Sequence, residues 1–273
     1  MKLHYYKPPD GSSNFGDELN RFIWNHYFPN FFDEDNTSVF FGIGTIMRAA
    51  KKIYPDTAIT IFGSGAHASS QEMEPNFEVD FVRGPFSAKA LGLDDTKWIT
   101  DPAILTPKVF PMLGVKKRYK YSYMPHFSVA NHYYKEVFES IGIHYIDPRD
   151  EVEDILERIN ATEVLLTEAM HGAILADAYR VPWLPVYSYS SLNHFKWKDW
   201  SESLGIQIRS NKIPRFYIND GGIKLFIKKR ITIKKVKKIC ALSPYLSDAA
   251  KSKQALSRIE ERIALFKEKH ALI

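Results

Sequence analysis

Four ionisable side chains stand in motifs from which they could move protons or hold an anion: His171, Asp17, Glu168 and Arg83. An imidazole and a carboxylate can act as general base and general acid. A guanidinium can bind a carboxylate or a phosphate through two parallel hydrogen bonds. These residue types therefore predict acid–base chemistry on an anionic substrate. A histidine that only caps a turn remains an alternative for His171, and a surface ion pair remains one for Arg83.

The local pattern places His171 in the first turn of a helix that follows a buried strand. Glu163–Thr167 is a β-branched and apolar run typical of such a strand. Met170–Tyr179 is expected to be a helix with apolar residues on nearly every face, and Val181-Pro182 ends it. Val181–Val186 is expected to form the next strand. The unpaired N–H groups of the helix start favour an anion beside His171.

Strand–helix alternation recurs in two sets, which predicts two parallel sheets with helices on both faces. The division expected is an α/β lobe at 1–112, a second α/β lobe at 118–212 and a helical extension at 213–273. A fifth strand–helix repeat of the first lobe is expected at Trp98–Ala103. Ligands bind beyond the carboxyl ends of the strands in such sheets. The polar or small residues expected at those ends are Asn14, Gly63, Arg83, Asp101, His126 and His171.

Several further residues are candidates for substrate contacts. Gly16 allows close backbone approach at the start of the helix expected over Glu18–His26. The loop Gly63-Ser64-Gly65 could hold a phosphate, although tight turns use the same residues. Lys196 and Trp197 belong to FKWKDW, which predicts either a sugar-stacking edge or one face of a packed helix. The remaining candidates are Ser87, Asp101, His126, Met170 and Gly172.

Composition narrows the class of protein. The chain has 273 residues, of which 45% are hydrophobic, and it carries 37 Lys and Arg against 32 Asp and Glu. Its one cysteine, Cys240, excludes an internal disulfide and a cysteine-based zinc site, and no histidine pair has ligand spacing, so no metal is expected. No apolar run approaches the ~20 residues of a membrane span, and the first residues lack an apolar signal core. The expectation is a cytoplasmic protein.

The positive charge is concentrated in one stretch. Lys224–Lys238 holds eight basic residues and no acidic one, so the net charge of +5 would be −3 without it. A basic helix with interspersed Ile, Leu and Phe indicates contact with an anionic membrane surface. A solvated helix face is the alternative, and no nucleic-acid recognition motif accompanies the stretch. Ala250–Leu272 is expected to be an amphipathic helix that packs on the first lobe or pairs with a partner.

Taken in order, the motifs of the first 200 residues resemble the polysaccharide pyruvyl transferase family. They are NFGDELN, GSG, VRGPFS, TDPA, PH, TEAMHGAILADAYRVPW and FKWKDW. The resemblance implies two Rossmann-like lobes of the GT-B type. It also implies transfer of the enolpyruvyl carbons of phosphoenolpyruvate onto two hydroxyls of a sugar, which forms a cyclic ketal and releases phosphate. Many relatives carry an arginine just before the central histidine, where this chain has Ala169 and Met170. Arg83 or Lys196 would then hold the phosphate.

The resemblance assigns roles to the candidate residues. His171 is expected at the donor phosphate or in proton delivery, and Arg83 at the donor carboxylate or phosphate. Asp17 is the first candidate for the base on the acceptor hydroxyl, and Glu168 the second. Supporting contacts are expected from His126, Asn14 and Lys196.

The resemblance also implies the partners. They are phosphoenolpyruvate as co-substrate, with no further cofactor, and an acceptor sugar of a capsule or exopolysaccharide repeat unit. The acceptor is expected on a polyprenyl diphosphate carrier at the inner face of the cell membrane. No nucleic acid is expected. A GT-B glycosyltransferase that uses a nucleotide sugar and a non-catalytic, membrane-bound assembly protein are the alternative functions.

Overall fold

The first lobe is built on four parallel strands. The computed structural model describes residues 1–8, 11, 14–189 and 193–272. The strands are hydrogen-bonded in sequence order, β1-β2-β3-β4. Their bounds are Lys2–His4, Ser38–Phe41, Ala58–Phe62 and Phe77–Phe81. Both faces of the sheet are covered, since Phe40 and Phe62 pack with Trp24 of α1 (Phe15–Tyr27), while Val39 and Ile59 pack with α2 (Met47–Ile53).

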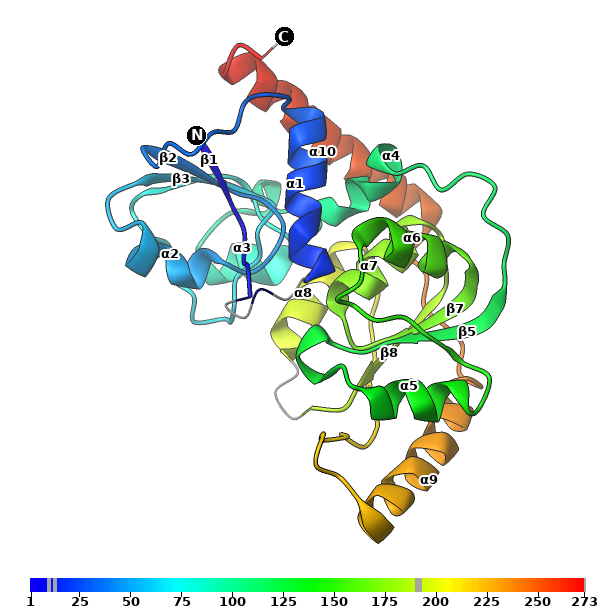
Figure 1. Ribbon diagram of the computed structural model, residues 1–273. Helices are drawn as coiled ribbons and strands as arrows, with labels where there is room; N and C mark the ends of the chain where they lie inside the picture. The colour runs from blue at the N-terminus through cyan, green and yellow to red at the C-terminus, as the bar shows by residue number, and fades with distance from the viewer. Residues whose placement is uncertain (9–10, 12–13, 190–192, 273) are drawn as a thin grey trace.

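The second lobe holds a five-stranded parallel sheet in the order β6-β5-β7-β8-β9. The strands are β5 (Tyr119–Met124), β6 (His144–Tyr145), β7 (Thr162–Thr167), β8 (Trp183–Tyr187) and β9 (Asn211–Lys212). Its helices include α5 (His132–Glu139), α6 (Val152–Asn160) and α7 (Met170–Ala178). Chain order reverses between β5 and β7, and such a switch point opens a crevice at the strand ends. The expected α/β class with two parallel sheets is confirmed (Figure 1).

The fifth strand–helix repeat expected at Trp98–Ala103 is wrong. Trp98 forms an isolated parallel bridge to Val82, and 3₁₀ turns η1 (Asp95–Lys97) and η2 (Pro102–Leu105) stand on either side. Pro102 has no N–H to give to a sheet, and Asp101 accepts a hydrogen bond from the Ala103 N–H, which starts the turn instead. Short helices α3 (Pro85–Ala90) and α4 (Thr106–Val109) complete this part of the chain.

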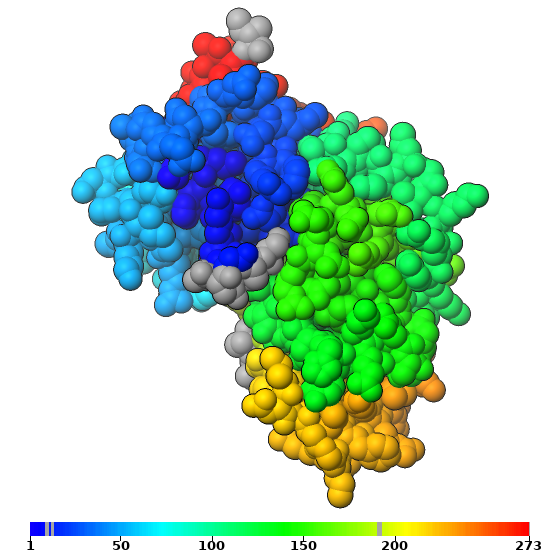
Figure 2. Space-filling model, viewed as in Figure 1, coloured from blue at the N-terminus to red at the C-terminus, as the bar shows by residue number. Residues whose placement is uncertain are grey.

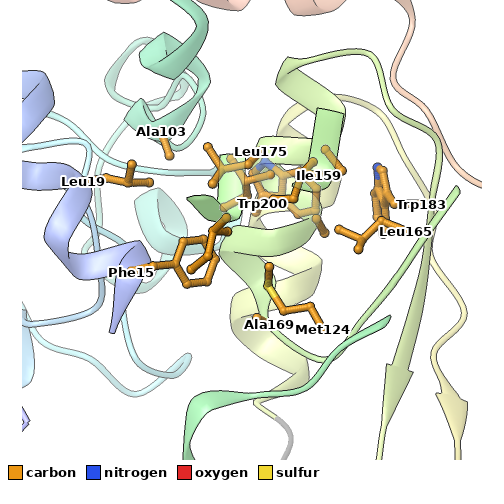
Figure 3. Packing of buried hydrophobic residues seen from close by; sticks show 14 of the residues in the cluster. Phe15, Leu19, Ala103, Met124, Ile159, Leu165, Ala169, Leu175, Trp183 and Trp200 are labelled. Carbon is orange, nitrogen blue, oxygen red and sulfur yellow. The ribbon is translucent and has the colours of Figure 1, made fainter. Parts of the chain in front are cut away.

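Two helices that come after β8 in sequence pack against the first lobe. α8 (His194–Ser203) packs against α3, and α10 (Ala249–Lys269) packs against η2 and forms ion pairs with Glu78 and Asp80 of β4. Phe266 of α10 contacts the aromatic rings of Phe28, Phe40 and Phe62. One apolar cluster therefore extends through both lobes, and Figure 3 shows Phe15 of α1 in the same group as Trp200 of α8. This shared core holds the lobes together around the region between them.

α9 (Gly222–Ile239) lies at the end of the molecule opposite the C-terminus (Figure 1). Thr232, Val236 and Ile239 are its buried residues. Within the described residues, no helix combines the length and the apolar character that crossing a membrane requires.

Candidate active site

A cleft of about 740 Å³ lies between the two lobes. The first lobe lines it with residues that follow β1 and β2 and with the start of α1. The second lobe lines it with residues that follow β5, β7 and β8, and β5 and β7 flank the switch point. Figure 2 shows the boundary at which the blue first lobe meets the green second lobe. The cleft thus occupies the place where α/β sheets bind ligands.

Three helices begin at this cleft. Phe15 starts α1, Met170 starts α7, and Asn193 is the N-cap of α8; all three residues line the cleft. In α1 and α7 the N-cap side chain accepts no hydrogen bond from the first turn. Unpaired N–H groups and aligned helix dipoles favour negative charge. Their convergence makes the cleft suited to an anionic ligand.

His171 stands at the mouth of α7 with a buried carboxylate behind it. Its Nε2 lies 3.8 Å from Oδ2 of Asp101, and both atoms are buried without a hydrogen-bond partner among the described residues. A closer approach of about 1 Å would make this a hydrogen bond. Burial, Arg83 and Lys196 lower the pKa of His171 to about 3, so the ring is neutral. A neutral imidazole backed by a carboxylate has the arrangement of a general base.

Gly16 makes room for the His171 ring. A β-carbon on residue 16 would stand 1.9 Å from Nδ1 of His171, so any larger residue would displace the imidazole. The close approach expected for this glycine is therefore made to a side chain of the other lobe.

We expect the Gly16→Ala variant to lose activity without losing its fold. Alanine favours helix over glycine by up to about 1 kcal/mol, but a catalytic group displaced by about 1 Å can cost on the order of 10²-fold in rate. Steady-state kinetics and thermal unfolding measure the two effects. Gly221→Ala is the matched control, because nothing within 4 Å meets its added β-carbon. Equal activity of the two variants would contradict the contact with His171.

Asp17 faces the cleft from the first turn of α1. Its carboxylate accepts a hydrogen bond from the side-chain amide of Asn14, which also lines the cleft. Burial raises the pKa of Asp17 to about 7, and the nearby Lys196 opposes that rise. A carboxyl with such a pKa holds its proton in part of the molecules at neutral pH and can deliver it as a general acid.

Lys196 brings a full positive charge to the cleft from the first turn of α8. Burial and Arg83 lower its pKa to about 8, so it is mostly protonated at neutral pH. His126, after β5, has a pKa lowered to about 4 by burial and by Lys196. Because Nδ1 of His126 accepts a hydrogen bond from the Ser128 N–H, the proton of the neutral ring is on Nε2. Lys196 and His126 can therefore both donate hydrogen bonds to an anion.

Glu168 lines the cleft but is fully engaged in the protein. Its Oε1 accepts a hydrogen bond from the Tyr123 hydroxyl, and its Oε2 accepts from the backbone N–H and the hydroxyl of Ser188, at 3.0 and 2.9 Å. Burial raises the pKa of Glu168 to about 7. These contacts tie the ends of β5, β7 and β8 together. Glu168 therefore has a structural role, because its carboxylate is not free to act as the base on the acceptor hydroxyl.

Arg83 lies behind the cleft wall, with no exposed surface. Its Nε donates to Oδ2 of Asp199 at 3.2 Å, and Nη1 donates to the Thr45 hydroxyl. Ser87 also donates to Asp199, through its N–H and its hydroxyl. Arg83 and Ser87 were expected to contact the donor; the structure instead builds both into a buried network that joins α3 to α8. Arg83 acts on the cleft through its charge, which lowers the pKa of His171.

The other residues expected to contact substrate also divide into those that line the cleft and those that only pack within the protein. Gly65 packs on the Arg83 guanidinium and Gly63 packs on Pro102. The buried Ser64 hydroxyl donates a hydrogen bond to the Gly44 carbonyl. The GSG loop is therefore a packing element that does not line the cleft. Gly172 lets α7 pack on Thr167. The candidates that do line the cleft are Asn14, Asp17, His126, Glu168, Met170, His171, Lys196 and Trp197.

Sequence reasoning missed several residues of the lining. Thr45 follows β2 and Tyr189 follows β8, so both stand at strand ends and the strand-end rule could have found them. His67, beyond the GSG loop, carries no local signal of this kind. Its carbonyl accepts a hydrogen bond from Asn193 of the other lobe. Among the described residues no group of three His, Cys, Asp or Glu side chains is placed to hold a metal ion.

Fold and site together define a class: a two-lobed α/β protein with acid–base side chains and a lysine at a cleft where three helices begin. Residues 11–191 match the model of the family described as polysaccharide pyruvyl transferase. The match covers more than half of the chain, which therefore belongs to this family. The resemblance seen in the motifs is confirmed, and the chain is a transferase of polysaccharide biosynthesis.

The comparisons also identify two similar proteins. The succinoglycan biosynthesis protein ExoV of Rhizobium meliloti (strain 1021) is 36% identical over 219 residues, which are 78% of this chain and 68% of ExoV. Among solved structures, the UDP-GlcNAc 2-epimerase of Methanocaldococcus jannaschii, in complex with UDP-GlcNAc and UDP, is similar with a TM-score of 0.44 and 13% identity. That likeness covers 93% of this chain and 83% of the epimerase.

Proposed function

We propose that the protein transfers the enolpyruvyl carbons of phosphoenolpyruvate to a sugar of an exopolysaccharide repeat unit and forms a cyclic ketal. The family supports the transfer of a pyruvyl group. The observation that carries the choice of donor is the meeting of Lys196 with three helix starts at one cleft, because phosphoenolpyruvate presents both a phosphate and a carboxylate. A volume of about 740 Å³ has room for such a donor beside a monosaccharide. The acceptor sugar would be carried on a polyprenyl diphosphate lipid.

The reaction needs one base and one acid. One acceptor hydroxyl adds to C2 of the donor while a proton adds to C3, which becomes the methyl group. The second hydroxyl then attacks C2, and the C2–O bond to phosphate breaks with its electron pair leaving on phosphate. The two hydroxyl protons balance the one taken up by C3 and the one that leaves with phosphate.

The neutral ring of His171 and the partly protonated carboxyl of Asp17, which line the same cleft, support one role each. His171 is neutral, since its pKa is lowered to about 3, and Asp101 stands behind its Nε2, so His171 is the base on the acceptor hydroxyl. Asp17, whose pKa burial raises to about 7, is the acid that protonates C3. This reverses the roles inferred from the sequence, in which Asp17 was the base. Lys196 and His126 bind the donor anion.

Product analysis tests this function. The protein is incubated with phosphoenolpyruvate and lipid-linked oligosaccharide acceptors, and mass spectrometry is used to detect the ketal on the sugar. Phosphate release that depends on the acceptor is the expected companion. A nucleotide-sugar glycosyltransferase would instead release a nucleoside diphosphate, and an assembly protein would release neither. No ketal with any acceptor of the producing cell's own polysaccharide would contradict the proposal.

Replacing Lys196 by methionine should weaken donor binding most. Methionine keeps an unbranched side chain one atom shorter than lysine but removes the charge, and a hydrogen bond to a charged group contributes about 1.5–3 kcal/mol, or on the order of 10- to 150-fold in KM for phosphoenolpyruvate. The KM for the acceptor should change little. Lys198→Met is the matched control, because Lys198 is exposed on the same helix and does not line the cleft. Equal donor KM in both variants would remove Lys196 from the donor site.

The pH profile should have an alkaline limb from Asp17 and a fall below pH about 6, where Asp101, whose pKa burial raises to about 6, gains a proton and loses the charge behind His171. Above pH about 7 the proton of Asp17 is lost, so kcat/KM falls by up to tenfold per pH unit. His171, with its pKa near 3, stays neutral throughout this range. The alkaline limb should persist in the Lys196→Met variant. In the Asp17→Asn variant it should be absent, and kcat/KM should be low and independent of pH above pH about 7. Activity that rises above pH about 7 would give Asp17 the role of a base instead.

A further inference from the structure

α9 is held in one orientation by the second lobe. Its residues Thr232, Val236 and Ile239 are buried against the protein. Lys229 forms an ion pair with Glu136 of α5, and Lys228 forms one with Asp220. These contacts fix the rotation of the helix about its axis, so its opposite side faces solvent. Figures 1 and 2 show the start of α9 at the tip of the molecule.

The outward side of α9 is apolar at the tip. Ile223, Phe226, Ile227 and Ile231 are 79%, 58%, 49% and 43% exposed, and their spacing places them on one side of the helix. Ile218, in the preceding segment, is 74% exposed. A tip with this much apolar side chain in contact with water indicates a binding surface that is covered in use.

The charges that α9 itself carries all have one sign, and the exposed Glu136 of α5 beside it is paired with Lys229. Gly222–Ile239 contains no acidic residue. Lys228 and Lys229 are turned toward carboxylates of the protein; the other six basic residues are exposed, although Lys224 also stands 3.9 Å from the Asp220 carboxylate. The six are Lys224, Arg230, Lys234, Lys235, Lys237 and Lys238.

Lysine is depleted at protein–protein interfaces, whereas an apolar strip beside several lysines and arginines is what helices lying in a bilayer interface present. The partner must offer an apolar layer beneath negative charges. We propose that α9 docks the protein on a bilayer of anionic lipids, with Ile218, Ile223, Phe226 and Ile227 entering the headgroup region. The exposed lysines and Arg230 contact the lipid phosphates.

Vesicle sedimentation tests this docking without donor, acceptor or turnover, so its result is separate from that of the proposed function. The full chain is mixed with vesicles of phosphatidylcholine alone or of phosphatidylcholine with phosphatidylglycerol. We expect binding to the anionic vesicles, weakened by salt, and little binding to the neutral ones. Binding that is equal for both vesicles and unaffected by salt would overturn the proposal.

Two variants separate the apolar tip from the charges. Lys234→Gln, Lys235→Gln, Lys237→Gln and Lys238→Gln together should lower the partition coefficient by roughly fivefold per residue, or several-hundred-fold in all. Ile223→Ser with Phe226→Ser should lower it by tenfold or more at high salt as well, since apolar burial is lost.

Matched controls carry the same changes elsewhere on the surface. Leu113→Ser alters a residue that is 88% exposed, and Lys52, Lys89, Lys116 and Lys253 to Gln remove four exposed charges. Both should bind as the wild type does. Equal losses in the control and the α9 charge variant would show that only net charge matters, and would overturn the docking. The proposal would also be overturned if the protein bound a DNA duplex but no vesicles. A dimer that the tip substitutions dissociate, in a protein that binds no vesicles, would overturn it as well.

Discussion

Replacing His171 by alanine should lower kcat by about 10²- to 10⁴-fold, the usual contribution of a positioned general base. The side chain is 13% exposed and lines the cleft, so truncation opens space at the surface of the site and leaves the core intact. The KM for phosphoenolpyruvate should change little, because Lys196 and the helix starts bind the donor. Rates of ketal formation and phosphate release, measured at saturating donor, check the prediction.

Two further variants make the result specific. His26→Ala removes an exposed imidazole at the end of α1 and should behave as the wild type. Asp101→Asn keeps the shape of the residue behind Nε2 but removes its charge, so we expect a loss of about 10- to 100-fold as for other residues that orient a functional group. Near wild-type ketal formation by His171→Ala would transfer the role of base to another side chain.

The elements that place His171 could be predicted from the sequence because their signals are local. The apolar run before Thr167 and the proline after Val181 define a strand and a helix, and His171 has to fall at the helix start. Since parallel strands end at the same edge of a sheet, the histidine after β5 was also expected there. The cleft follows from these rules, and the structure brings Asn14, Asp17, His126, His171 and Lys196 to it.

The direction in which a polar side chain points could not be predicted, because it depends on partners distant in sequence. Arg83 was the first candidate for the donor and Lys196 a supporting contact, and both stand near an element end. The partner that removes Arg83 from the cleft is Asp199, 116 residues away and in the other lobe. The motif FKWKDW is part of helix α8, so its side chains point in different directions. Lys196 faces the cleft, whereas Trp200 faces the core and Asp199 faces α3.

Breaking the buried pair of Arg83 and Asp199 should give the largest loss of stability of any single change considered. Both side chains have no exposed surface. Asp199→Ala leaves the guanidinium charged and unpaired and leaves the Ser87 N–H without its acceptor. Removing one partner of a buried pair costs about 3–5 kcal/mol. The free energy of unfolding in urea measures it, and Asp150→Ala, which breaks the partly exposed pair with Arg158, should cost no more than about 1 kcal/mol.

A double variant separates the role of the pair in folding from a direct role in donor binding. Arg83→Met with Asp199→Asn removes both charges, and the asparagine oxygen can still accept from Ser87. Because no charge is then buried alone, the double variant should be more stable than Asp199→Ala. Its KM for phosphoenolpyruvate should rise less than that of Lys196→Met, since Arg83 does not line the cleft. The reverse order of the two KM values would show that Arg83 reaches the donor when the substrate is bound, and equal stability of Asp199→Ala and Asp150→Ala would contradict the buried network itself.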